Sequence, residues 1–477
     1  MKKPTRNPIQ ALILKAFAIL SVCFTGAVSL PAETLKVAVN AGTQALPEYE
    51  TSTTFIKVDL EGIRPNGHDR APLNIALVID RSGSMSGQKI EDAKNAAIYV
   101  IRQLQKNDIV SVVTYSDSVE VLIPATKVSD KNGLINRVRN IRSDGNTALF
   151  AGVSKGAAEV RKFIDKHRIN RVILLSDGLA NVGPSSPREL GQLGHSLARE
   201  SISVSTLGIG YGYNEDLMTK LAYNSDGNHV FVENSSELAD IFSQELGELF
   251  TVTAKEICIR IKVSEDLEII RFLGREGDIR GNIAEITLNQ VADKQEKYVM
   301  LEVRHDPSTS NNRELFASVD IDYLNPFKAK REQTSQRYVF DRVADSELVE
   351  ASVNKNVIKD ATLQIATLNT ERAVQFRDEG KLKEAEEAFE DNAALLGRTA
   401  LRYDLDGLSK AAQANEDDAE SVYDEARWDS KRKQLREEQT TVRTSQSIGS
   451  KLNRYIDTEE VPVESEPEVV DESEKEK

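Results

Sequence analysis

The sequence predicts an α/β fold, a doubly wound and mostly parallel sheet, together with an antiparallel β-sandwich-like region and a C-terminal helical region. Short runs that are apolar on both faces recur between residues 72 and 250, as buried parallel strands require. Amphipathic helical periods separate these runs, and strand and helix in alternation indicate a doubly wound sheet. Downstream, the apolar period changes to two, and then the composition becomes helical.

The elements of the α/β region follow from its apolar pattern. The strands are predicted at "LNIALVID" (73–80), "IVSVVTYS" (109–116), "RVILLSD" (171–177) and "ISVSTLGIG" (202–210). The two helical stripes consist of Ile90, Ala93, Ala97, Ile101 and Leu104, and of Leu149, Val153, Ala157 and Val160. In such sheets, ligands bind beyond the carboxyl ends of the strands, where the strand order reverses.

The region from residue 251 to residue 345 has a different period. The runs "EICIRIKV", "NIAEITL", "YVMLEV" and "LFASVDIDY" alternate apolar and polar residues, which predicts half-buried antiparallel strands in a sandwich. In the N-terminal segment (33–71), "FIKVDLEG" (55–62) alternates in the same way. We expect this strand to join the later ones, which would make the α/β domain (72–250) an insertion in the sandwich.

Residues 346–446 are rich in Ala, Glu, Lys, Leu and Arg with helical periods, so a helical region is predicted. Within it, one stretch is similar to a single tetratricopeptide unit, and the positions that carry the similarity are Ala373, Phe376, Gly380, Leu382, Ala385 and Phe389. Because one unit cannot bury its own apolar face, we expect a helical hairpin packed on neighbouring helices.

The two ends of the chain have distinctive compositions. Residues 1–32 begin with Lys2, Lys3 and Arg6 and continue into an apolar stretch, which is typical of an export signal. We therefore expect a periplasmic, cell-surface or extracellular protein, with membrane contact only if the signal is uncut or lipidated. Residues 447–477 form an acidic tail, with ten acids against two lysines after residue 456, and are predicted to be disordered.

Charge and cysteine content narrow the possible ligands. A formal net charge of −15 argues against a nucleic-acid partner, because phosphate binding needs clustered Lys and Arg. A divalent cation is the more natural ligand for an acidic chain. Of the two cysteines, Cys23 lies inside the predicted signal, so a cleaved chain would keep Cys258 alone and form no internal disulfide.

Oxygen-bearing side chains follow two of the predicted strands. In "VIDRSGSMSGQ" (78–88), Asp80, Ser82 and Ser84 occupy alternate positions of a turn, which can direct all three oxygens toward one point. Thr147 stands at a helix start and Asp177 ends another strand. A hard cation such as Mg²⁺ takes about six oxygens and usually keeps several waters, so a few protein oxygens are enough to hold it.

Each of these residues alone has a simpler explanation. Ser82 or Ser84 could cap the helix of residues 89–104, Thr147 could cap its own helix, and Asp177 with Gly178 could form an ordinary turn. A calcium-binding EF-hand is disfavoured, because Met85 stands where that loop needs glycine and a strand precedes the loop instead of a helix. The agreement of all five positions favours one shared metal site.

Taken in order, these residues resemble the metal-ion-dependent adhesion site of von Willebrand factor type A (VWA) domains, in a protein of the bacterial exported type. The resemblance covers residues 72–250. It implies that Ser82, Ser84 and Thr147 give hydroxyl oxygens directly to Mg²⁺, Mn²⁺ or Ca²⁺, while Asp80 and Asp177 act mainly through coordinated water. It also implies an open coordination position, which an acidic residue of a partner protein fills.

Enzymatic function is not expected. The sequence has no H-E-x-x-H zinc motif, no nucleophile elbow and no phosphate-binding P-loop, and so it offers no catalytic residues. We predict a cation-dependent protein-binding module for adhesion or assembly, whose partner presents an exposed Asp or Glu. One alternative is a structural scaffold in which the metal only stabilises loops and the helical region binds partners. A metal-assisted hydrolase is the least favoured alternative.

Overall fold

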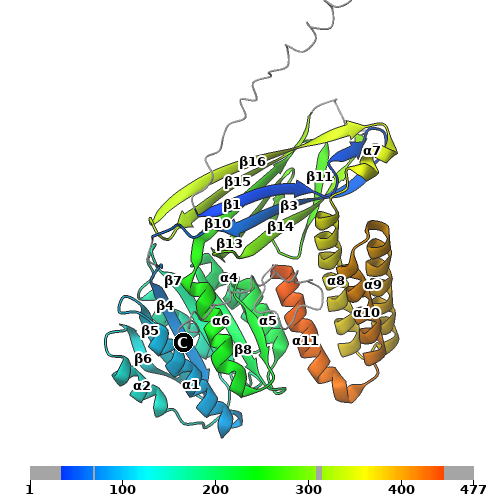
Figure 1. Cartoon of the computed structure of the whole chain (residues 1–477). Helices are drawn as coiled ribbons and strands as arrows, with labels where there is room; N and C mark the ends of the chain where they lie inside the picture. The colour runs from blue at the N-terminus through cyan, green and yellow to red at the C-terminus, as the bar shows by residue number, and fades with distance from the viewer. Residues whose placement is uncertain (1–33, 68–69, 308–313, 445–477) are drawn as a thin grey trace, which may run out of the picture.

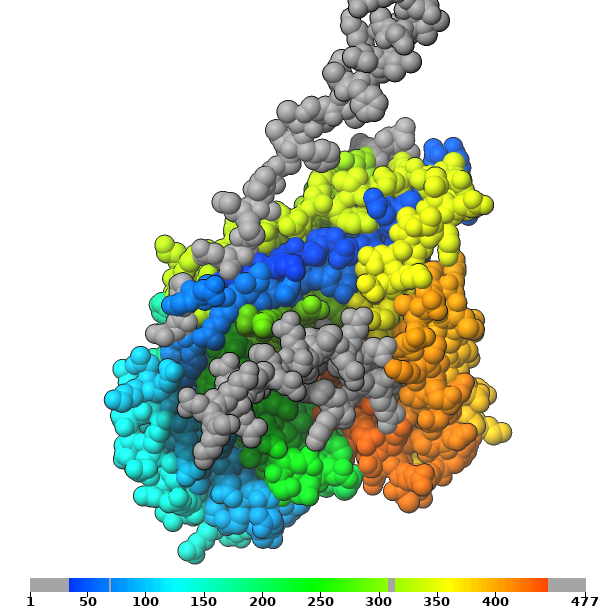
Figure 2. Space-filling model, viewed as in Figure 1, coloured from blue at the N-terminus to red at the C-terminus, as the bar shows by residue number. Residues whose placement is uncertain are grey.

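The computed structural model describes residues 34–67, 70–307 and 314–444. Within these residues, a β-sandwich, an α/β domain and a group of long helices pack against one another (Figures 1 and 2). No helix of the described ranges has the length and hydropathy needed to cross a bilayer. The predicted export signal (1–32) and the predicted acidic tail (447–477) both lie outside the described residues.

The α/β domain is a doubly wound sheet with strand order β6-β5-β4-β7-β8-β9, in which β6 is antiparallel to β5 and the other neighbours are parallel. Its strands are β4 (Leu73–Asp80), β5 (Ile109–Tyr115), β6 (Val119–Lys127), β7 (Ile169–Ser176), β8 (Ile202–Ile209) and β9 (His229–Val232). Its helices are α1 (Gln88–Gln103), α2 (Lys131–Arg139), α3 (Leu149–Arg161), α4 (Pro187–Arg199), α5 (Glu215–Asn224) and α6 (Leu238–Phe250).

Helices cover both faces of this sheet, which explains why its central strands are apolar throughout. Alternate residues of β4 point to opposite sides: Ile75, Leu77 and Ile79 pack with α1, α2 and α6, whereas Ala76 and Val78 pack with α3, α4 and α5. Each face therefore has its own core, and the fold class predicted from the apolar runs is confirmed.

The sandwich consists of two facing sheets in the described part of the chain, with strand orders β1-β3-β14-β11 and β12-β13-β10-β15-β16-β2. Its strands are β1 (Leu35–Ala41), β2 (Ala45–Pro47), β3 (Ser52–Gly62), β10 (Val252–Val263), β11 (Leu267–Leu273), β12 (Asp278–Arg280), β13 (Ile283–Ala292), β14 (Glu296–His305), β15 (Leu315–Asn325) and β16 (Lys330–Val343). Apolar side chains from both sheets form one shared core between them.

The α/β domain is inserted in this sandwich. Strand β3 pairs with β14, so that Ile56 lies opposite Leu301 and Val58 opposite Val299, which is the pairing that an insertion requires. At the end of β3, a Cβ atom on Gly62 would lie 1.9 Å from the carbonyl oxygen of Ala292. Glycine at this position therefore permits the close approach of the two chains where β3 leaves the sandwich.

The sequence pattern missed several strands of the sandwich. The N-terminal segment contributes β1 and β2 in addition to the predicted strand, and β11 and β16 also join the sheets. Strand β16 carries mostly charged and polar residues, and only Thr334 and Phe340 of its side chains are buried. Because almost no apolar alternation remains, the period-two signal is absent from β16 although its pairing with β15 is regular.

The helical region consists of α7 (Ser346–Ala351), α8 (Lys355–Asp378), α9 (Leu382–Tyr403), α10 (Asp406–Ser421) and α11 (Glu425–Thr444). Helices α8 and α9 form the predicted hairpin, with Ala373, Ala385 and Phe389 in a core that also includes Trp428 of α11. The hairpin packs on α10 and α11, as a unit with an apolar face requires. Its likeness to a tetratricopeptide unit stays a prediction.

Two polar contacts hold the three parts in place. Asp226, in the turn before β9, accepts hydrogen bonds from Arg275 Nη1 at 2.9 Å and the Asn289 backbone NH at 2.7 Å, and lies 3.4 Å from Lys297 Nζ. We call these four residues the Asp226 junction. On the other side, Arg432 of α11 pairs with carboxylates of α5 and α8, including Asp378 at 2.8 Å.

The sandwich thus covers the amino ends of the parallel strands, because Asp226 precedes β9 and its partners belong to the sandwich. Lys255 of β10 adds a hydrogen bond at 2.6 Å to the carbonyl of Arg168, just before β7 begins. The carboxyl ends of the strands, where ligands bind in doubly wound sheets, face away from the sandwich.

Candidate metal centre

The five predicted ligands lie at the point where the strand order reverses. Strand β4 is the first strand of the domain, and the chain adds β5 on one side of it and β7 on the other. Asp80 is the last residue of β4, and Asp177 directly follows β7. The crevice between two neighbouring parallel strands that are connected in opposite directions is the ligand site of this fold class.

The turn after β4 brings the two serines together. The Ser82 backbone NH donates a hydrogen bond to Asp80 Oδ1 at 2.8 Å, and a short 3-10 helix (Gly83–Met85) follows. The Oγ atoms of Ser82 and Ser84 lie 3.1 Å apart, and Ser84 Oγ donates to Asp177 Oδ1 at 2.7 Å. The hydroxyls thus connect the turn after β4 with the loop after β7.

Thr147 reaches the same place from the loop before α3. Its backbone NH donates to Asn181 Oδ1 at 2.9 Å, and its carbonyl accepts from the Asn181 NH at 3.2 Å. A Cβ atom on Gly178 would lie 3.2 Å from Thr147 Oγ1 and 3.4 Å from Ser84 Oγ, so both hydroxyls border this glycine. The structure therefore brings Asp80, Ser82, Ser84, Thr147 and Asp177 together, and we call these five residues the oxygen cluster.

Helix capping does not account for these hydroxyls. The residue that caps α1 is Gly87, and the residue that caps α3 is Ala148, and neither helix has a side-chain hydrogen bond at its cap. The 3-10 helix that starts after Ser82 has no side-chain cap either. The serines and Thr147 are therefore available for another role at the carboxyl edge.

The two carboxylates of the oxygen cluster are almost fully buried. Asp80 is 0% exposed and Asp177 is 2% exposed. Burial raises the pKa of Asp80 and the negative charge of Asp177 raises it further, although hydrogen bonds from Ser176 Oγ and the Ser82 NH act in the opposite direction. Two buried anions without full compensation are costly, and a cation would reduce this cost.

Two further residues complete the surroundings of the oxygen cluster. Ser176 Oγ donates to Asp80 Oδ2 at 2.7 Å, and Lys89 Nζ lies 2.5 Å from Asp177 Oδ2. Ser176 directly precedes Asp177 in the sequence, and no role was predicted for it. Lys89 was missed because its contact joins α1 to a loop 88 residues away, and its position in the first turn of α1 was the available signal.

The donor set fits a hard divalent cation. Buried carboxylates and hydroxyl oxygens are the groups that Mg²⁺, Mn²⁺ and Ca²⁺ prefer over nitrogen or sulfur. No three His, Cys, Asp or Glu side chains gather as a metal cluster anywhere in the described ranges. Hydroxyl oxygens and water would therefore have to complete the coordination of an ion here. Ser82, Ser84 and Thr147 would hold the ion, and Asp80 and Asp177 would balance its charge.

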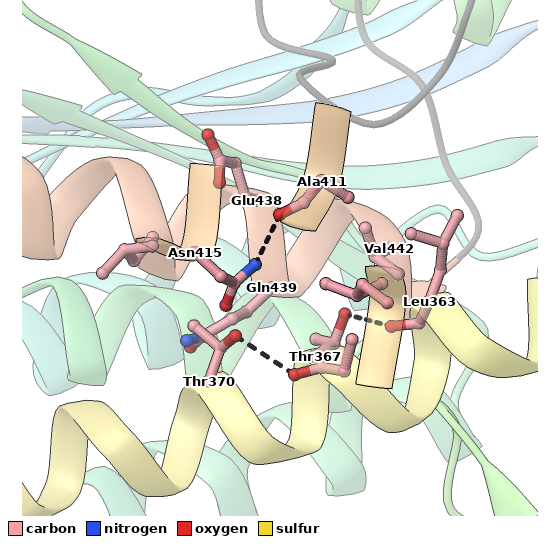
Figure 3. Close-up of a pocket in the computed structure, with 11 residues that line it drawn as sticks. Leu363, Thr367, Thr370, Ala411, Asn415, Glu438, Gln439 and Val442 are labelled. Atoms are coloured by element: carbon pink, nitrogen blue, oxygen red, sulfur yellow. Dashed lines mark hydrogen bonds between the residues drawn. The ribbon is translucent and has the colours of Figure 1, made fainter. Parts of the chain in front are cut away.

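A separate cavity lies inside the helical region, between α8, α9, α10 and α11 (Figure 3). Leu363 and Val442 border it on one side, and Thr367, Thr370 and Asn415 add polar atoms. Its volume of about 20 Å³ has room for about one water molecule. This cavity is too small for a substrate.

Comparison with known proteins supports the assignment of the α/β domain. Residues 74–244 match the family model of the von Willebrand factor type A domain. The chain is 27% identical over 274 residues to an uncharacterised protein of Synechocystis sp., covering 55% of this chain and 64% of that protein. It is 30% identical over 185 residues to inter-alpha-trypsin inhibitor heavy chain H3 of Homo sapiens, covering 37% of this chain and 20% of that protein. The chain thus spans less than two thirds of either relative.

Solved structures show a similar fold over most of the chain. A von Willebrand factor type A protein from Catenulispora acidiphila superposes with a TM-score of 0.64 at 14% identity, covering 80% of this chain and 91% of that one. The ArnB paralog VWA2 from Sulfolobus acidocaldarius gives a TM-score of 0.59 at 19% identity, covering 87% and 100%. Residues 74–244 thus match the von Willebrand factor type A domain by sequence, and the strand order and these structures show the corresponding fold.

Proposed function

We propose that the chain is a divalent-cation-dependent protein-binding module for adhesion or assembly. In this proposal, Asp80, Ser82, Ser84, Thr147 and Asp177 hold Mg²⁺, or Mn²⁺ or Ca²⁺ in its place. An exposed Asp or Glu of a partner protein completes the coordination. The observation that carries the proposal is the convergence of five oxygen-bearing side chains from three loops at the reversal point of the sheet.

The chemistry of the oxygen cluster supports an open coordination position. Its three hydroxyls are neutral, so a divalent ion bound here meets few negative charges in direct contact and keeps an attraction for a further carboxylate. The carboxyl edge also faces away from the sandwich, so a large partner can approach it. Binding through a metal and one acidic residue needs no deep pocket.

The alternative is a scaffold in which the ion only ties the loops together. The three loops are already connected without an ion, since the Gly83 NH donates to the Gly145 carbonyl at 2.9 Å and the Asn181 NH, in the loop after β7, donates to the Thr147 carbonyl at 3.2 Å. An ion would add little to loops that the backbone already joins. This argues for a role in binding and against a purely structural role.

Calorimetric titration of the full chain with Mg²⁺ and Mn²⁺ tests the metal site. We expect heat of binding and a rise in Tm for the wild type, and neither effect for Thr147→Ala, which removes one hydroxyl ligand but leaves the core intact. Thr399→Ala is the matched control, because Thr399 lies on α9 and its hydroxyl bonds only within that helix, to the Leu395 carbonyl. The absence of heat and of a Tm change in the wild type would refute the proposal.

A pull-down from a bacterial envelope extract, with Mg²⁺ or with a chelator, tests the partner. The proposal requires a partner that is lost both with the chelator and with Thr147→Ala. If chelation lowers Tm but the partners stay bound, the scaffold alternative is correct and the helical region becomes the binding surface. A metal-assisted hydrolase is the least favoured function, and a screen of ester and phosphate substrates with and without chelator would detect it.

We also propose that the chain is exported, with its mature form in the periplasm, on the cell surface or outside the cell. The support is the charge and hydropathy pattern of residues 1–32. Mass spectrometry of the amino terminus of the protein recovered from an envelope fraction would test it, and recovery of the uncut chain from the cytoplasm alone would contradict it.

A further inference from the structure

Lys89 lies beside the oxygen cluster without belonging to it. Its Nζ atom contacts Asp177 Oδ2 at 2.5 Å, while Ser84 Oγ donates to the other oxygen of the same carboxylate at 2.7 Å. The Asp177 side chain is fully buried, whereas the Lys89 side chain is 39% exposed. The carboxylate is thus held between a hydroxyl of the oxygen cluster and an ammonium group that reaches solvent.

The formal charges at this edge give Lys89 a specific effect. The carboxylates of Asp80 and Asp177 together cancel the two charges of a divalent ion, so the ammonium of Lys89 supplies the surplus positive charge of a loaded site. Asp117, a further carboxylate at this edge, is exposed and accepts a hydrogen bond from Asn146 Nδ2. Solvent therefore screens the charge of Asp117 more than that of the buried groups.

We propose that Lys89 sets the charge balance of the oxygen cluster, weakening its affinity for the cation and strengthening the attraction of the loaded site for the partner's carboxylate. This inference rests on the proposed function. A positive charge a few ångströms from a bound cation repels it, and the same charge attracts an anion that approaches from solvent. Lys89 is a specificity-determining residue in this scheme, and it does not replace any of the five ligands.

A merely structural role for Lys89 predicts a different pattern. If Lys89 only holds Asp177 and the first turn of α1 in position, its loss weakens the binding of cation and carboxylate alike. If it sets the charge balance, the two affinities move in opposite directions. The sign of the two changes therefore separates the explanations.

The experiment compares Lys89→Met and Lys89→Arg in the full chain. For Lys89→Met we expect Mg²⁺ to bind about tenfold more tightly in calorimetry, a size set by one partly solvated charge near a divalent ion. Acetate serves as the carboxylate probe, added to the Mn²⁺-loaded chain and followed through the water-proton relaxation that Mn²⁺ produces. Its affinity should fall about fivefold in Lys89→Met, because the attracting charge is lost. Lys89→Arg keeps the positive charge, so it should bind Mg²⁺ and acetate with the affinities of the wild type.

Lys94→Met is the matched control, because Lys94 lies on the same helix but pairs with Glu91 at 2.6 Å, and it should leave both affinities unchanged. If the wild type binds Mg²⁺ and Lys89→Met changes both affinities in the same direction or neither of them, the role of Lys89 is refuted while the proposed function stands. If the wild type binds no Mg²⁺, the proposed function fails and this inference fails with it.

Discussion

The oxygen cluster and the Asp226 junction lie at opposite edges of one sheet, and both contain a buried carboxylate in very different surroundings. Although burial acts to raise it, Lys297 and Arg275 lower the pKa of Asp226 to about 2, and the Asn289 NH adds a hydrogen bond. Burial raises the pKa of Asp80, and no adjacent Lys or Arg is among the causes that shift it. The protein's own cations thus compensate the charge of Asp226, whereas the charge of Asp80 is left for an added cation to compensate.

The difference indicates how one domain uses buried charge for two purposes. At the amino edge, cations from the sandwich reach Asp226 and fix the position of the α/β domain, so this edge is structural. At the carboxyl edge, the described residues give the two carboxylates one ammonium contact, that of Lys89 with Asp177. Incomplete compensation is costly in the isolated chain, but it gives the edge an affinity for added positive charge.

The largest expected effect comes from removing the charge of the saturated carboxylate. Asp226→Asn keeps the shape of the side chain and tolerates the positive φ of 52° at this position, but it leaves Arg275 and Lys297 buried without their anion. We expect the free energy of unfolding, measured by urea denaturation, to fall by about 3 kcal/mol. A loss well below ~1 kcal/mol would show that the buried cations Arg275 and Lys297 do not depend on the negative charge of Asp226.

Glu437 of α11 tests the opposite limit, a buried carboxylate with almost no compensation. Burial raises its pKa to about 8, and the backbone NH of Phe231 in β9 gives one opposing hydrogen bond. Because the folded-state pKa lies above the unfolded value, the neutral acid stabilises the fold at low pH and this stability is lost as the pH rises through about 8.

From about pH 5 to about pH 8, the wild type should therefore lose about 3 kcal/mol of stability relative to Glu437→Gln, which cannot ionise, and the loss should end above about pH 8. Thermal and urea denaturation at several pH values would measure the difference. Parallel pH profiles for the two proteins would show that Glu437 is already ionised in the folded chain or is more solvated than its burial indicates.

The smallest effect on stability is expected for Asp80→Asn in the presence of a chelator. The amide oxygen can still accept one hydrogen bond and the amide group can donate to Ser176 Oγ, while the cost of a buried charge disappears. We expect a change within about 1 kcal/mol in either direction, in contrast to Asp226→Asn. Saturating Mg²⁺ should raise the Tm of the wild type but not of this variant. An equal rise in both proteins would show that Asp80 is not part of the metal site.

Much of this arrangement could be predicted from the sequence. The parts that could not be predicted have one property in common. Strands such as β4 and β7 were found because burial on two faces leaves a continuous apolar run, and the turn after β4 was found because its alternating oxygens are close in sequence. Asp226, Arg275 and Lys297 come from distant segments whose pairing leaves no periodic pattern. The contact of Lys89 was missed for the same reason, since it depends on how α1 meets the loop after β7.

The insertion of the α/β domain also determines how a mechanical force would travel through the molecule. The domain is joined to the sandwich by two covalent connections, through β3 and through β10, and each of these is an inner strand of a different sheet. A pull on the carboxyl edge is therefore divided between both sheets and meets a ladder of hydrogen bonds on either side of each strand. Neither connection enters the sandwich through an edge strand, which would peel away under a smaller load.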